Sequence, residues 1–180
     1  MLMKSNFTII GILASAFLII GFLGSKTNFI YQKSIDQFAN DYKNYVTEQY
    51  GLKQIASGGE FMNAVHSIHF GFYKDQPTTV DAARILIIDL AQEYLRKVNQ
   101  SKSLRPFLDH YPHDVYDISI SCSFPLNLEN QTAKNVSGIT LSDGKIRYFL
   151  SHNSSNHRML HSELYDEACA LLDQTDSDEQ

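Results

Sequence analysis

Tryptophan is absent from this chain of 180 residues, and only two cysteines and four prolines occur in it. The 10 tyrosines and 11 phenylalanines are therefore expected to anchor the core. An excess of basic residues is also lacking, because 15 lysines and arginines stand against 20 acidic residues, for a net charge of −5. Proteins bind phosphate backbones through clustered lysine and arginine, so we expect no nucleic-acid partner.

The sequence also lacks the motifs of common catalytic and ligand sites. It holds no Gly-x-Ser-x-Gly motif, no Ser-x-x-Lys in a suitable setting, and no Asp-rich calcium loop. The glycine pair Gly58-Gly59 is not followed by the Gly-Lys of a phosphate loop. Hydrophobic residues make up 43% and charged residues 19%, which is typical of a folded domain rather than a disordered chain.

One long apolar run lies at the N-terminus. Residues Phe7–Leu23 carry no charge, and at about 1.5 Å per helical residue this length roughly matches the hydrocarbon core of a membrane. Signal peptidase needs small residues at the positions before its cut, but Phe22 and Leu23 occupy them. We therefore predict an uncleaved signal-anchor that contacts the membrane through Phe7–Leu23.

This anchor divides the chain into four expected parts. They are a short tail (1–6), a transmembrane signal-anchor (7–24), a single α+β domain outside the cytoplasm (25–172) and an acidic flexible tail (173–180). Lysines lie both before and after the span, so the positive-inside rule leaves open the opposite orientation, with a cytoplasmic domain.

The first 50 residues, where Phe-Thr-Ile-Ile opens an apolar helix that leads into an amphipathic one, resemble type IV pilins and pseudopilins. Asn6 stands where that family has its processing glycine, and Gly11 where it has an acidic residue. Because these positions serve cleavage and assembly, we do not assign the chain to the family.

Three helices are predicted after the anchor. Ser34-Ile35-Asp36-Gln37 reads as a capping box that opens a helix ending at Gly51, although this helix could instead continue from the membrane span. Apolar residues at helical spacing predict a central helix from Val80 to about Asn99 and a final one over Arg158–Leu172.

The strands follow a period of two. Met62–Tyr73 looks strand-like, and Tyr116–Phe124 alternates strictly between apolar and polar residues. Val136–Leu141 and Lys145–Leu150 flank Asp143-Gly144, a strong hairpin signal. We therefore predict an α+β fold in which an N-terminal transmembrane helix precedes helices packed on one face of a small antiparallel β-sheet.

Histidine is the residue most able to carry chemistry here. His157 and His161 are four apart on the final predicted helix, which can place two imidazoles on one metal ion. A zinc protease needs glutamate directly after the first histidine, but Arg158 stands there. His110 and His113 bracket Tyr111-Pro112 in a loop and could approach each other.

Two other pairs of residues, one of histidines and one of cysteines, are weaker candidates for a metal site or a disulfide. His66 and His69 are three apart on a predicted strand, so they face opposite sides and cannot chelate together. Cys122 and Cys169 could form a disulfide if the last helix covers the strand, but two free thiols are the main expectation.

From these patterns we predict no catalytic residues, no cofactor and no metal site, with His157, His161, His110 and His113 as the candidates should a metal bind. The predicted function is a small membrane-anchored binding or scaffolding module. The alternative is an exported enzyme or metal-binding protein that uses scattered histidines. A pocket that gathers His110 or His113 with His157 or His161 would favour the alternative.

Overall fold

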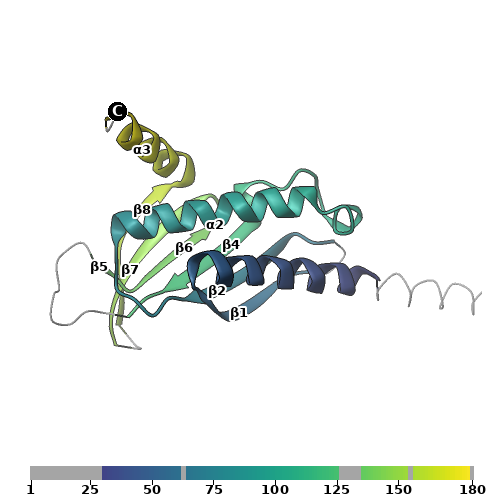
Figure 1. Ribbon diagram of the computed structural model, residues 1–180, viewed down its shortest axis with the longest axis horizontal. Helices are drawn as coiled ribbons and strands as arrows, with labels where there is room; N and C mark the ends of the chain where they lie inside the picture. The colour runs from purple at the N-terminus through teal and green to yellow at the C-terminus, as the bar shows by residue number, and fades with distance from the viewer. Residues whose placement is uncertain (1–29, 62–63, 126–134, 154–155, 179–180) are drawn as a thin grey trace, which may run out of the picture. The chain divides into compact units, whose positions relative to one another are not determined.

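The computed structural model describes residues 30–61, 64–125, 135–153 and 156–178 (Figure 1). The chain divides into two compact units, Met1–Gln37 and Phe38–Gln180, and the sheet belongs to the second. Within the described part, no helix combines the length and apolar character that a membrane crossing requires. Phe7–Leu23 lies outside the described residues, so the anchor stays a prediction.

Residues 30–50 form one helix. The predicted capping box is wrong, because Ser34 lies inside this helix and its hydroxyl donates to the Ile30 carbonyl at 2.9 Å. The predicted end is confirmed. Gly51 has φ +66°, and its N–H donates to the Thr47 carbonyl at 3.1 Å. Glycine adopts this left-handed conformation without steric cost.

A six-stranded mixed sheet forms the centre of the second unit. Its order is β1-β2-β4-β6-β7-β8, and all neighbours are antiparallel except β2 and β4. The strands are β1 (Lys53–Glu60), β2 (Ser67–Tyr73), β4 (Ile118–Ser123), β6 (Gly138–Ser142), β7 (Lys145–Asn153) and β8 (Asn156–Leu164). A separate two-stranded ladder joins β3 (Thr78–Thr79) and β5 (Asn135–Val136).

Helix α2 (Val80–Gln100) explains the parallel pair. Parallel neighbours need a long crossover connection, and α2 supplies it between β2 and β4. The prediction of this helix is confirmed, with Thr79 as the N-cap that accepts from the Ala82 N–H at 3.3 Å. The prediction of a wholly antiparallel sheet is wrong, because the crossover places β2 beside β4.

The hairpin between β6 and β7 is confirmed. Asp143 and Gly144 form its two-residue turn, with φ of 52° and 65°. Two positive φ values in succession match the right-handed twist of the flanking strands, which is why Asp-Gly is favoured there. The strand predicted at Tyr116–Phe124 is shorter than expected. Tyr116 lies in a 3-10 turn, η2 (Val115–Asp117), and is exposed.

The predicted final helix at Arg158–Leu172 is wrong in its first half. Residues up to Leu164 form β8, which pairs with β7, and α3 (Tyr165–Asp178) begins only after it. Pairing with the free edge of β7 satisfies the backbone of this segment, and that tertiary gain overrides its helical spacing. Helix α3 continues into residues 173–178, which we had expected to be a flexible tail.

The core lies between the sheet and two helical segments, α2 and residues 38–50, whose aromatic side chains pack on β2 (Figure 1). Tyr42, from residues 38–50 of the N-terminal helix, packs on Phe70 of β2 and on Tyr94 of α2, with ring centroids 4.7 and 5.5 Å apart. Its hydroxyl donates to the Leu90 carbonyl at 2.8 Å. The absence of tryptophan is thus offset by a buried cluster of phenylalanines and tyrosines.

A buried polar network joins α2 to the edge of the sheet. Arg84 of α2 donates from Nε to Oε1 of Glu163 on β8 at 2.8 Å, and the Tyr148 hydroxyl of β7 donates to the same oxygen. The guanidinium also contacts Asp81, which is exposed. Glu163 and Tyr148 are buried, so α2 and β8 are held together by charge-assisted hydrogen bonds in a protein interior.

Candidate functional site

The candidate site lies in the connection between α2 and β4, residues 101–117. This segment includes a 3-10 turn, η1 (Arg105–Phe107), and is joined by backbone hydrogen bonds to the residues before β2. The Val65 N–H donates to the Phe107 carbonyl at 2.7 Å, and the Asp109 N–H donates to the Val65 carbonyl at 3.2 Å. Val65 is buried, so these bonds fix the connection at the amino-terminal ends of the two parallel strands.

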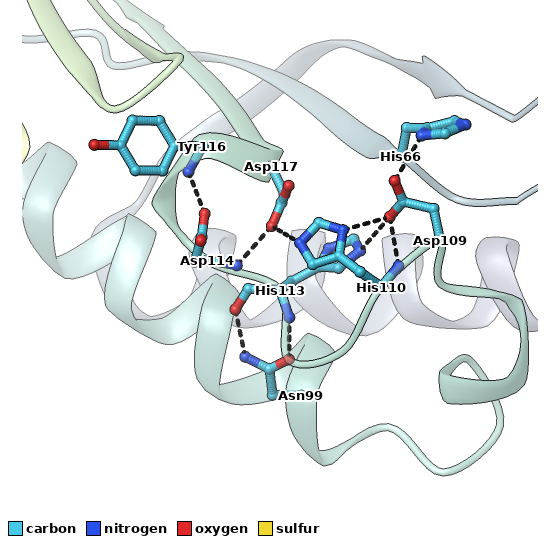
Figure 2. Close-up of polar contacts among 8 residues, drawn as sticks. All are labelled: His66, Asn99, Asp109, His110, His113, Asp114, Tyr116 and Asp117. Atoms are coloured by element: carbon cyan, nitrogen blue, oxygen red, sulfur yellow. Dashed lines mark hydrogen bonds and ion pairs between the residues drawn. The ribbon is translucent and has the colours of Figure 1, made fainter.

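Three imidazoles gather around the carboxylate of Asp109 (Figure 2). His66 Nδ1 lies 2.7 Å from Oδ2, and His110 Nδ1 lies 2.9 Å from Oδ1. His113 Nε2 lies 3.6 Å from the same Oδ1. One ligand atom from each of Asp109, His110 and His113 can be chosen so that all three lie within 4.8 Å of one another.

His113 is the buried member of the cluster. Its side chain is 0% exposed, and neither ring nitrogen has a hydrogen-bond partner among the residues that the structure describes. Burial lowers the pKa of His113, because desolvation disfavours the imidazolium; neighbouring Asp117 acts in the opposite direction. The backbone of Val65 approaches the ring without the geometry of a hydrogen bond. The buried His113 ring thus presents Nε2 to the carboxylate of Asp109 at 3.6 Å, a distance too long for a hydrogen bond.

Asn99 at the end of α2 fixes the backbone of His113. Its amide nitrogen donates to the His113 carbonyl at 2.9 Å, and its amide oxygen accepts from the His113 N–H at 2.8 Å (Figure 2). Two bonds from one side chain define both the position and the direction of this backbone. The peptide bond between Tyr111 and Pro112 is cis.

Asp117 orients His110 from the opposite side. Its Oδ2 lies 2.9 Å from His110 Nε2 and accepts from the Asp114 N–H at 2.6 Å. The His110 ring thus has a carboxylate on each nitrogen. Partial desolvation lowers the pKa of His110, but Asp117 and Asp109 outweigh it and raise that pKa above its usual value.

The charge of Asp109 is stabilised by its histidines. Desolvation alone would raise the pKa of this carboxyl, but hydrogen bonds from His66 and His110 outweigh it, and the pKa is lowered. The cluster therefore offers a carboxylate whose pKa is lowered, a buried imidazole and two further imidazoles. This donor set suits a divalent metal ion.

The structure brings together only part of the predicted set. The expected approach of His110 and His113 is confirmed, with ring centroids 5.3 Å apart. The expected helical pair of His157 and His161 is wrong, because both residues lie on β8. His161 stacks on Tyr148 and lies 3.8 Å from Glu163, in the network at the sheet edge.

Sequence reasoning missed His66 and Asp109. The spacing Asp109-His110-x-x-His113 was a local signal that could have found Asp109. His66 carried no such signal, because the backbone pairing of Val65 brings it to residues 43 positions away. His69 lies on β2 and pairs with Ser119, whereas His66 precedes that strand.

Cys122 and Cys169 are free thiols, as mainly expected. Comparisons of the chain with protein-family models, with curated proteins and with solved structures found no match.

Proposed function

We propose that this protein is a binding module for a divalent transition-metal ion, held by Asp109, His110 and His113. The observation that carries the proposal is the buried ring of His113, which has no hydrogen-bond partner within the described part of the chain and faces the carboxylate of Asp109, whose pKa is lowered. Burying a polar nitrogen without a partner costs roughly 1–3 kcal/mol. Coordination through Nε2 would offset that cost.

Two of the three spacings between donor atoms suit a four-coordinate ion after a small adjustment, and the third, between His110 and His113, is within 4.8 Å. Bonds of about 2.0–2.2 Å place tetrahedral ligand atoms roughly 3.4 Å apart. The 3.6 Å between His113 and Asp109 is already suitable, and the 2.9 Å between His110 and Asp109 must open by about 0.5 Å. The half-exposed ring of His110 has room for that movement.

The donor types favour zinc and its neighbours over calcium or magnesium. Imidazole nitrogen suits Zn²⁺, Cu²⁺ and Ni²⁺, whereas Ca²⁺ takes six to eight oxygen ligands. Asp117, 2.9 Å from Nε2 of His110, serves as an outer partner that orients this ligand, an arrangement typical of metal sites. Asn99 instead fixes the backbone of His113.

We also propose that the domain is displayed outside the cytoplasm by the anchor at Phe7–Leu23. The uncharged length of that run supports this placement. On this proposal the site would take up metal ions from an extracytoplasmic compartment.

Isothermal titration of the untagged full-length chain in detergent with ZnCl₂ tests the metal proposal. We expect one site per chain, and thermal unfolding should show added stability of about 2.7 kcal/mol at a zinc concentration of 100 Kd. His110→Ala should abolish tight binding, and because this ring is half exposed the variant should still fold. His113→Asn should also abolish tight binding of zinc.

His69→Ala is the matched control, because it removes an exposed histidine from β2 without touching the cluster. Its affinity for zinc should equal that of the wild type. The proposal fails if the wild type binds no zinc, or if His110→Ala and His69→Ala lower the affinity equally.

A further inference from the structure

The two oxygens of Asp109 serve different partners. His110 and His113 both face Oδ1, at 2.9 and 3.6 Å, whereas His66 contacts Oδ2 at 2.7 Å (Figure 2). An ion placed among Oδ1, His110 Nδ1 and His113 Nε2 therefore has His66 on the far oxygen of its carboxylate ligand. In that position His66 donates a hydrogen bond to Asp109 rather than a lone pair to the metal.

The backbone holds His66 in this role. Its N–H donates to the Glu60 carbonyl at 3.0 Å, and the preceding residue, Val65, is bonded to Phe107 on one side and Asp109 on the other. The imidazole thus approaches Asp109 from a fixed direction. Carboxylates that bind metal ions are commonly hydrogen-bonded by such outer partners, which orient them.

The exposure of the cluster is one-sided. His113 is fully buried, whereas the side chain of Asp109 is 25% exposed and that of His110 is 48% exposed. An ion held by these three residues has the protein interior on the His113 side and solvent on the opposite side. Zinc sites with three protein ligands keep a fourth position for water or an added ligand, whereas structural sites have four protein ligands.

Building on the proposed function, we propose that the bound ion keeps one exchangeable position on its solvent side, filled by water and open to a small monodentate anion, and that His66 is a positioning residue that fixes Asp109 through Oδ2. The charge of the site favours this ligand class. A divalent ion with one carboxylate and two neutral imidazoles carries a net charge of +1, which attracts an anion.

Cobalt(II) with azide as the added anion tests both statements, because the visible absorption of Co²⁺ reports its ligands and geometry. In the full-length wild type, azide should change the Co²⁺ spectrum in a saturable way. His66→Ala should weaken Co²⁺ affinity by about 10–100-fold, yet give an unchanged spectrum at saturation. His66→Asn should restore most of the affinity, because its amide nitrogen matches the position of Nδ1 and can donate to Oδ2. His69→Ala should match the wild type in every respect.

Two results would overturn the inference. A shifted or weakened spectrum in cobalt-saturated His66→Ala would show that His66 is itself a ligand, and a wild-type spectrum unmoved by azide would show a closed site. Failure of His66→Asn to recover affinity would also refute the positioning role. A wild type that binds no Co²⁺ or Zn²⁺ is a separate result, which refutes the proposed function itself.

Discussion

Glu163 provides the most quantitative test of how the sheet edge is held. Its carboxylate is 6% exposed and accepts from Arg84 Nε at 2.8 Å and from the Tyr148 hydroxyl. Glu163→Gln keeps the shape and one acceptor oxygen but removes the charge. Because the guanidinium itself is only 13% exposed, solvent screens the pair weakly.

The expected cost follows from the two hydrogen bonds. A bond to a charged group contributes about 1.5–3 kcal/mol and a neutral one about 0.5–1.5 kcal/mol. In Glu163→Gln the Tyr148 bond becomes neutral, whereas the Arg84 bond keeps its charged donor and loses the opposite charge, so the variant should cost about 1–2 kcal/mol. Glu163→Ala leaves both donors without this partner and should cost about 3–5 kcal/mol, the range for breaking a buried ion pair. Asp81→Ala removes the exposed partner of the same guanidinium and should cost less than about 1 kcal/mol.

Urea unfolding of the single variants and of a double variant measures these terms. Arg84→Met combined with Glu163→Met replaces the pair by apolar groups, which is often close to neutral. The double variant should therefore be more stable than either single variant, with a coupling energy of about 2 kcal/mol or more. Additive losses, or equal losses in Glu163→Gln and Asp81→Ala, would refute the assignment of a buried charged network.

Three further predictions concern the sheet, the thiol and the leader. The Ile120 side chain is 1% exposed, so Ile120→Ala should lower the free energy of unfolding by about 2–5 kcal/mol. Ser121→Ala, on the other face of β4, should lower it by less than about 0.5 kcal/mol. If urea unfolding gave the two values in reverse, the strand would be shifted by one residue. Burial raises the pKa of the Cys122 thiol from 9.0 to about 12, so between pH 7 and pH 10 the thiol ionises only in the unfolded chain. Over this pH range the wild type should therefore lose about 1.4 kcal/mol more stability than Cys122→Ala. A parallel loss in both proteins would contradict this. Intact mass measurement of the mature protein should find the residues before Ser25, and a start at Ser25 or Lys26 would refute the uncleaved anchor.

Local signals predicted the elements that depend on local physics. The Asp143-Gly144 turn and the apolar stripe of Val80–Asn99 depend on residues that are close in sequence. Both elements lie where they were expected. Strand β1 was missed because almost all of its residues are exposed, so its sequence does not alternate between apolar and polar residues. Strand β8 was mistaken for helix because pairing with β7, rather than its own spacing, decides its conformation.

The candidate site divides in the same way. His110 and His113 are close in sequence, so their approach could be anticipated from a short loop. The contribution of His66 depends on backbone pairing between Val65 and residues 107–109, a contact that no local pattern encodes. The burial of His113 also follows from the fold, because it requires the connection to be fastened to both α2 and the segment before β2.

The parallel pairing of β2 with β4 has a consequence for synthesis of the chain. Strand β2 leaves the ribosome well before β4. Phe70 and Phe72 therefore cannot pair with Ile120 and Cys122 until those residues have been translated. About 50 residues separate the partners, which at roughly 5–20 residues per second means a delay of about 3–10 s. During that interval the hairpin of β1 and β2 exposes the edge of β2 that later pairs with β4. Such surfaces attract chaperones and aggregate. The nascent chain is therefore most vulnerable between the completion of β2 and the emergence of β4.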